Sequence, residues 1–283
     1  MIRSAIPRAA RQLRAAHTMP DIKVARGQGI PGLFSPRGLE IAWFDYQHHL
    51  LTQLNLAIEK FPELGEIRGL GNFATALTQS EDPEFRPLAA TAAQAYTNEF
   101  FFKSINPAGS KNPHPVLGPG EFKNAPAPAL DLFAPMYNLP RMPEGTDELS
   151  EEDFASVQSQ DFHTFSFLTR SSDFGKLANF KELAITRGDL QMGNGAVWLV
   201  KHGDQGSLMN TYGWGTPLTH QTAEGYEALT STSAQLSVTP VLAINLWEHV
   251  YLYDYGVAGK RRFLENVFDS IDWAVVDDRL APM

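Results

Sequence analysis

Cysteine is absent from this sequence of 283 residues. Without thiols the chain has no disulfide framework, no thiolate zinc site and no cysteine nucleophile. Long apolar runs are missing as well, since none approaches the roughly 18 to 20 residues that a membrane-spanning helix needs. With 43% hydrophobic residues, the composition instead predicts a globular protein with a substantial core and no membrane partner.

Acidic residues are missing from the first 20 positions, and the first carboxylate is Asp21. The same stretch contains four arginines, Arg3, Arg8, Arg11 and Arg14. A basic, amphipathic and acid-free N-terminus is typical of a mitochondrial transit peptide. Residues 1–17 are therefore predicted to direct the protein to the mitochondrial matrix; a disordered basic tail is the alternative.

The rest of the chain is strongly acidic. Removing residues 1–17 takes away four positive charges and no negative ones, which changes the net charge from −9 to −13. Binding to RNA by charge neutralisation needs many Lys and Arg contacts to phosphate. We therefore expect contact with nucleic acid to be limited and local.

Proline and glycine mark two segments without regular structure. Residues 18–35 are predicted to form an extended arm, and residues 107–159 are too long and too rich in proline and glycine for an ordinary connection. Both are expected to dock on other molecules. The arm includes GQGIPG, which has the spacing of a dinucleotide-binding fingerprint, but the following LFSP delays the helix that this motif needs, so no nucleotide site is predicted.

Hydrophobic periodicity predicts the regular elements. Helices are expected over residues 36–60, 67–77, 85–104, 173–186, 259–271 and 273–280, with a short one opened by a capping box at 150–153. Strands are expected over residues 196–202, 207–213 and 238–246. The predicted fold class is α+β, with a helical domain over residues 36–106 and an α/β domain over residues 160–283.

Two C-terminal motifs carry a family resemblance. TPVLAINLWEHVYLYDY at 239–255, followed by GKRRFLENVFDSIDW at 259–273, resembles the C-terminal signature of iron/manganese superoxide dismutases, which contains D-x-W-E-H-A-Y. The stretch MGNGAVWLV at 192–200 resembles the first strand of that family, with its G-x-G-x-x-W-L. The resemblance implies an N-terminal helical hairpin domain followed by a three-stranded antiparallel sheet with helices.

The family holds a redox metal with three histidines and one aspartate, and the resemblance implies where these ligands fall. The first position is Ala42, the second Asn98, the third Asn245 and the fourth His249. Imidazole and carboxylate ligands suit such metals, whereas one imidazole and two amides do not. The sequence therefore predicts neither a bound metal nor any other cofactor, and no catalytic residue.

The residues around the implied metal site differ from the family as well. Tyr46 stands where the family has a second histidine on the first helix, and Leu50 and Leu252 stand where it has tyrosines. A shifted alignment that used His48 or His49 as the first ligand would still leave Asn98 and Asn245. These two histidines are interpreted as helix-surface or interface residues.

The W-E-H sequence of Trp247, Glu248 and His249 persists although the ligands do not. In the active family, this glutamate crosses a two-fold interface and hydrogen-bonds to the last ligand histidine of the partner. We therefore predict a dimer-type interface at these three residues; a solvated Glu248 beside two core residues is the alternative.

A targeting segment and a degenerate site together resemble the superoxide dismutase-like proteins of the mitochondrial small ribosomal subunit, which occur as a pair. The resemblance implies a structural protein whose partners are other mitochondrial ribosomal proteins, including a second superoxide dismutase-like chain. A metal-free interaction protein outside the ribosome and an active mitochondrial superoxide dismutase are the other two hypotheses.

Overall fold

The computed structural model describes residues 17–80, 82–109, 167, 177–203, 205–220 and 238–280. Residues 1–16 of the predicted transit peptide, most of the segment 107–159 and the capping box at 150–153 lie outside these residues. None of the described helices is both long enough and apolar enough to cross a membrane.

A long helical segment opens the structured part of the chain, where a single helix was predicted. It consists of α1 (Pro36–Leu39), the π-helix η2 (Glu40–Asp45) and α2 (Tyr46–Lys60). Ser35 caps its start, since its side chain accepts a hydrogen bond from the N–H of Gly38 over 2.9 Å, and proline occupies the first helical position. The π segment between the two α-helical parts is the one departure from the prediction.

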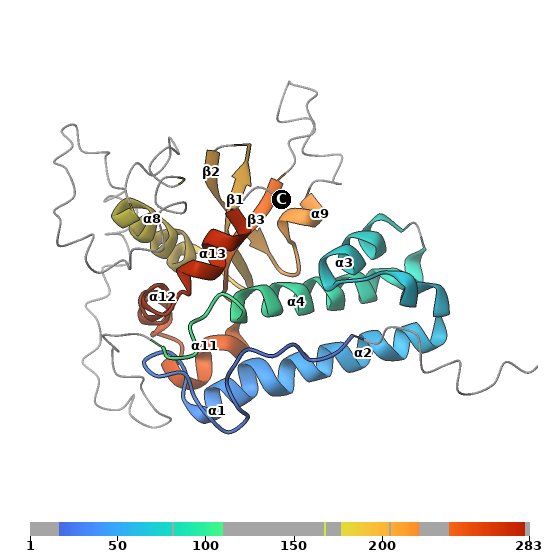
Figure 1. Ribbon diagram of the computed structural model, residues 1–283, viewed down its shortest axis with the longest axis horizontal. Helices are drawn as coiled ribbons and strands as arrows, with labels where there is room; N and C mark the ends of the chain where they lie inside the picture. The colour runs from blue at the N-terminus through green and yellow to red at the C-terminus, as the bar shows by residue number, and fades with distance from the viewer. Residues whose placement is uncertain are drawn as a thin grey trace, which may run out of the picture.

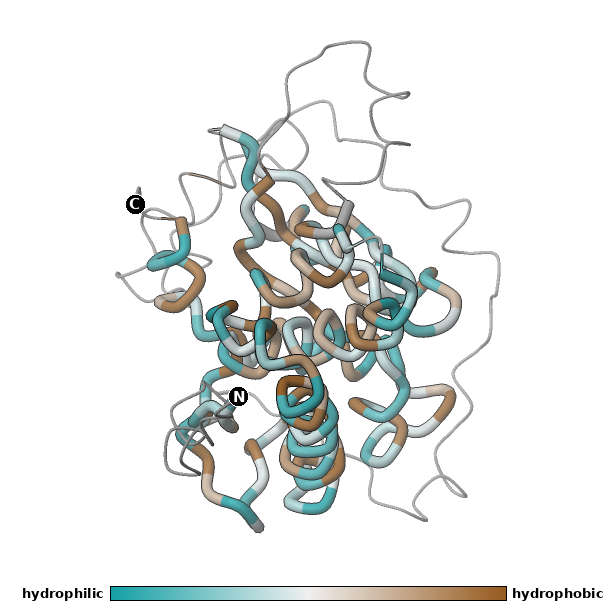
Figure 2. The backbone as a smooth tube through the Cα atoms, turned by 90° about the vertical axis from the view of Figure 1, so that its right-hand side faces the viewer, coloured by the Kyte–Doolittle hydropathy of each residue, from teal (hydrophilic) through white to brown (hydrophobic). Residues whose placement is uncertain are grey.

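Two further helices complete the helical half. After the short 3₁₀ turn η3 (Pro62–Glu66) come α3 (Leu70–Gln79), η4 (Pro83–Phe85) and α4 (Arg86–Phe102). The helix α4 lies beside α2, and α3 packs on α4 at the end far from the sheet (Figure 1). Apolar and polar residues are interspersed along these helices (Figure 2).

The α/β half is built on a three-stranded antiparallel sheet in the order β2-β1-β3. Its strands are β1 (Gly195–His202), β2 (Gln205–Tyr212) and β3 (Val238–Asn245). The helices of this half are α8 (Leu177–Leu190), α9 (Pro217–His220), α11 (Glu248–Tyr255), α12 (Lys260–Asp269) and α13 (Trp273–Leu280). The predicted α+β class and the antiparallel sheet are confirmed.

The central strand β1 is buried on both faces. Trp198 and its neighbours at alternate positions pack against Tyr96 and Phe100 of α4, so the helical half covers one face of the sheet. Val197 and Leu199 point into the main core, whose other members include residues of α8 and α12. The sheet is thus a middle layer between α4 and the C-terminal helices.

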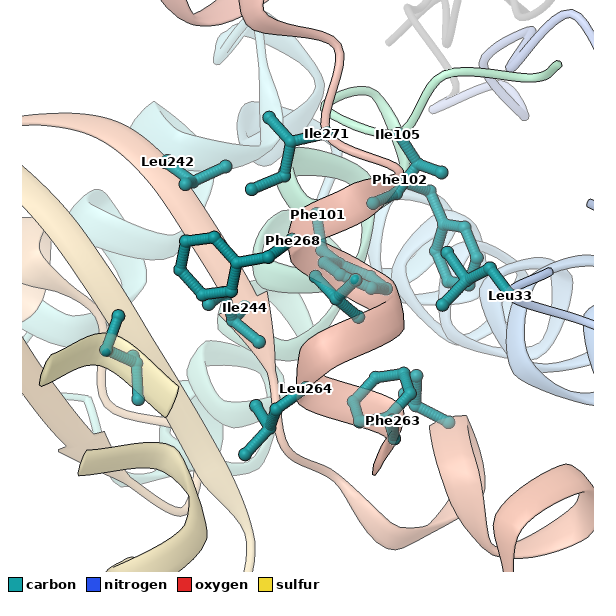
Figure 3. Packing of buried hydrophobic residues seen from close by; sticks show 14 of the residues in the cluster. Leu33, Phe101, Phe102, Ile105, Leu242, Ile244, Phe263, Leu264, Phe268 and Ile271 are labelled. Atoms are coloured by element: carbon teal, nitrogen blue, oxygen red, sulfur yellow. The ribbon is translucent and has the colours of Figure 1, made fainter. Parts of the chain in front are cut away.

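The main core lies where the two halves meet. Figure 3 shows Phe101 and Phe102 of α4 packed with Phe263 and Phe268 of α12 and with Leu33 from the N-terminal arm. The phenylalanine cluster that ends α4 therefore joins the hairpin to the C-terminal domain. The guanidinium of Arg279 in α13 strengthens this joint, since it lies 3.8 Å from the ring of Phe100 and donates to the carbonyl of Val241.

The N-terminal arm packs on the core of the same chain, while part of its length stays exposed. Its apolar side chains are buried in the core of the same chain: Ile22, Val24, Ile30, Leu33 and Phe34. The hydroxyl of Tyr255 donates to the Leu33 carbonyl over 2.7 Å. Apolar side chains at every few positions give the arm a burial energy of its own, and this offsets the lack of regular structure.

Candidate functional site

The implied ligand positions Ala42, Asn98 and Asn245 converge in the interior. They come from η2, α4 and β3, and none is more than 1% exposed. The side-chain amide of Asn98 donates to the carbonyl oxygen of Ala42 over 3.3 Å, and that of Asn245 donates to Oδ1 of Asn98 over 3.1 Å. Asn98 is therefore the point at which the helical half and the sheet are hydrogen-bonded to each other.

A further amide, Gln47 at the start of α2, completes this cluster and was missed by the sequence analysis. Its Oε1 accepts a hydrogen bond from Nδ2 of Asn98 over 3.0 Å, and its Nε2 donates to the carbonyl of Ala95 over 3.1 Å. The side chain is fully buried. We call Gln47, Asn98 and Asn245 the amide ladder.

The π segment explains why Gln47 reaches the ladder. In a regular α-helix, a residue five positions after Ala42 would point about 140° away from it. A π-helix closes hydrogen bonds between residues five apart, so Gln47 returns toward the face of Ala42. Apolar periodicity carries no signal for a single π turn, and the sequence therefore gave no reason to select Gln47.

The fourth implied position, His249, lies in the first turn of α11. Its ring stacks on Tyr46, with ring centroids 3.7 Å apart, and its Nε2 is buried without a hydrogen-bond partner. Burial lowers the pKa of His249 to about 4, so its imidazole is neutral near pH 7. Burial also raises the pKa of Tyr46 to about 12, and its hydroxyl donates to Oε1 of Gln94.

This set of side chains does not fit an iron or manganese ion. Ala42 has no side-chain donor atom, and the amides of Asn98 and Asn245 are bonded to each other through an N–H group. A metal needs several lone pairs that converge on one point, but Oδ1 of each asparagine already accepts a hydrogen bond. Among the residues that the structure describes, no three His, Asp or Glu side chains are grouped as metal ligands would be.

The other residues that the resemblance singled out are placed as follows. Leu50 is buried in the core of the helical half, and Leu252 packs against the main core. His48 and His49 are exposed on α2. None of these four side chains belongs to the amide ladder.

The W-E-H sequence lies where β3 passes into α11. Trp247 precedes the helix, and its N–H donates to Oδ1 of Asn245 over 3.0 Å. Glu248 is the first residue of α11 and is exposed, while its backbone N–H donates to Oδ1 of Asn194 over 3.2 Å. Within the described part of the chain, the carboxylate of Glu248 has neither a hydrogen bond nor an ion pair.

Large apolar side chains are exposed close to Asn194. Met192 is 84% exposed, Tyr212 64% and Trp214 40%. The backbone joins them, because Gly195 pairs with Tyr212 across β1 and β2 and the N–H of Gly213 donates to the Asn194 carbonyl. We call Met192, Asn194, Tyr212, Trp214 and Glu248 the Glu248 surface. Sequence reasoning found only Glu248 among them.

The fold of the α/β half is superoxide dismutase-like. Residues 169–279 match the family described as iron/manganese superoxide dismutases, C-terminal domain. This match includes the whole sheet and the W-E-H sequence.

Three relatives show how far the similarity extends. The chain is 24% identical over 275 residues to small ribosomal subunit protein mS43 of Schizosaccharomyces pombe, which covers 93% of this chain and 84% of that protein. It is 30% identical over 116 residues to small ribosomal subunit protein mS42 of the same organism, covering 38% of this chain and 47% of the relative. It is also 30% identical over 112 residues to the iron superoxide dismutase of Escherichia coli K12, covering 39% of this chain and 49% of that enzyme.

Proposed function

We propose that this protein is a structural component of the mitochondrial small ribosomal subunit, where its superoxide dismutase-like fold binds other proteins and performs no catalysis. One observation carries the proposal: the similarity to mS43 extends over 93% of the chain. The similarity to the iron enzyme extends over 39% of the chain. A relative that matches along nearly the whole length is thus a ribosomal protein.

The chemistry of the site supports a role without catalysis. Superoxide dismutation by this fold requires a redox metal, and the buried amides of Asn98 and Asn245 hold each other instead of converging on an ion. His249 retains an imidazole, but its ring is stacked on Tyr46. A single neutral imidazole does not retain a divalent ion with useful affinity.

The proposed location is the mitochondrial matrix, where the arginine-rich residues 1–17 would direct the chain. A fusion of residues 1–30 to a fluorescent reporter should enter mitochondria. The matched control replaces Arg3, Arg8, Arg11 and Arg14 by glutamine, and this reporter should remain in the cytosol. A wild-type fusion that stays cytosolic contradicts the proposed location.

The proposed neighbours are other mitochondrial ribosomal proteins, and the Glu248 surface is the proposed contact with a second superoxide dismutase-like chain. Neighbouring large apolar side chains that are exposed together are typical of protein interfaces. An interface at this place would cover Met192 and Trp214 and give the carboxylate of Glu248 a hydrogen-bond donor. The acidic body favours contacts with proteins over extensive contacts with rRNA.

Sedimentation tests the ribosomal role directly. The full-length chain, tagged at its C-terminus, is expected to sediment with small-subunit rRNA when a mitochondrial extract is separated on a sucrose gradient. The same tag on an unrelated matrix protein serves as the control. Sedimentation near the mass of the free chain or a dimer would instead support an interaction protein outside the ribosome.

A further inference from the structure

We propose that the amide ladder takes the place of an ion as the joint between the helical half and the sheet, and that it does so only because all three members are amides. The proposal concerns the interior of the protein. It does not depend on the ribosomal role, and it can fail or succeed separately from it.

The hydrogen bonds of the ladder all run in one direction. The N–H of Trp247 donates to Asn245, Asn245 donates to Asn98, Asn98 donates to Gln47, and Gln47 donates to the carbonyl of Ala95. Each amide in the series thus accepts through its oxygen and donates through its nitrogen. Consecutive hydrogen bonds in such a series polarise one another, so each bond strengthens the next in a low-dielectric interior.

The direction of the chain requires an amide at position 245. An aspartate there would place a carboxylate oxygen against Oδ1 of Asn98, which now accepts a hydrogen bond over 3.1 Å. Two acceptor oxygens at that distance repel each other, and the buried charge would have no cation to balance it. The residue type that would suit a metal at this position is therefore the one that breaks the ladder.

The ladder connects elements that the chain brings together from distant positions. Ala42 and Gln47 belong to the first helical segment, Asn98 and Ala95 to α4, and Asn245 to β3. Its first donor, Trp247, immediately precedes α11. The ladder therefore fixes the start of α11, and with it the position of Glu248, relative to the helical half.

Isosteric substitutions test the joint. Asn245→Asp keeps the size of the side chain and removes its donor, and it is expected to lower the Tm at pH 7.5 by about 5 °C or more. Asn72→Asp is the matched control, because Asn72 is exposed and its amide makes one local bond to the Arg68 carbonyl. Its Tm should stay within about 2 °C of the wild type. A wild-type Tm for Asn245→Asp would overturn the proposal.

A double substitution asks whether the amides act as one unit. Gln47→Met and Asn98→Leu each remove one side of the bond that joins these two side chains. Because the second substitution then loses a bond that is already broken, the Tm of the double variant should fall by clearly less than the sum of the two single losses. Additive losses would show two independent buried amides and would contradict the joint.

A metal titration separates the ladder from a hidden ion site. Thermal unfolding of the wild-type chain is followed with Mn²⁺ or Fe²⁺ alone and after dialysis against a chelator. We expect one Tm under all three conditions, since Asn98 and Asn245 already use the atoms that an ion would need. A Tm that rises with either ion, together with about one ion per chain retained after chelator dialysis, would overturn the proposal.

Discussion

Asn245 and Glu248 lie three residues apart in one sequence motif, but the structure places them in opposite environments. Asn245 is buried, and both its amide nitrogen and its oxygen are hydrogen-bonded. Glu248 is exposed and its carboxylate has no partner among the described residues. The side chain of Asn245 is closed off in the interior, whereas that of Glu248 faces solvent.

The two environments imply different roles for the side chains of this motif. Inside, Gln47, Asn98 and Asn245 form a network of neutral amides. At the surface, the carboxylate of Glu248 and several large apolar side chains are exposed and accessible to a binding partner. The interior is therefore expected to determine the stability of the chain, and the surface to determine its assembly.

The largest effect is expected at Glu248, on the free energy of pairing with the partner chain. In the proposed interface the carboxylate of Glu248 is desolvated and hydrogen-bonded, so Glu248→Ala should weaken pairing by about 3 kcal/mol or more. The chain's own stability should change by less than about 0.5 kcal/mol, because the side chain is exposed in the free protein.

Co-purification with ribosomal proteins and the position in a sucrose gradient measure the effect of Glu248→Ala. Glu59→Ala, at an exposed position on α2, is the matched control and should assemble normally. If Glu248→Ala assembles like the wild type, the interface lies elsewhere and the Glu248 surface has no role in assembly.

His249 lies between the two regions and gives a pH-dependent effect of intermediate size. Burial lowers its folded-state pKa to about 4 from the ordinary 6.5. Between these pH values the unfolded chain binds a proton that the folded chain does not, so stability is complete above about pH 6.5 and is lost as the pH falls toward 4. Since the side chain as a whole is only half-buried, we expect a loss of about 2 kcal/mol.

Urea unfolding at pH 7 and pH 4.5 measures this loss. His17 and His202, whose pKa values are also lowered by burial, contribute to the same trend. The variant His249→Gln removes the titrating ring and should reduce the difference in stability between the two pH values. An unchanged difference in this variant would mean that the imidazole of His249 is solvated.

The smallest effect is expected at the apolar part of the Glu248 surface. Met192→Ser should weaken assembly by about 1 kcal/mol, because the exposed thioether would lose its burial at the interface. The matched control is Leu56→Ser, which changes a 54% exposed side chain on α2. Equal effects of the two substitutions on assembly would show that Met192 has no special role.

The sequence by itself determined most of the architecture. Hydrophobic periodicity and the Ser-Pro start predicted the long first helix, α4, the three strands and the last two helices to within a few residues, because each repeats its apolar positions over several turns or pleats. The motif around residues 239–255 also predicted the superoxide dismutase-like fold. Local patterns of this strength need no knowledge of distant residues.

Only the tertiary structure decided what occupies the site. A single π turn leaves no trace in the apolar pattern, so no sequence pattern indicated that Gln47 would meet Asn98, 51 residues away. The same holds for the arm at residues 18–35. Its glycines and prolines predicted irregular backbone, but its burial depends on packing against α4 and α12. Hydrogen bonds and packing between distant segments follow from how the halves dock, and docking is a property of the folded chain as a whole.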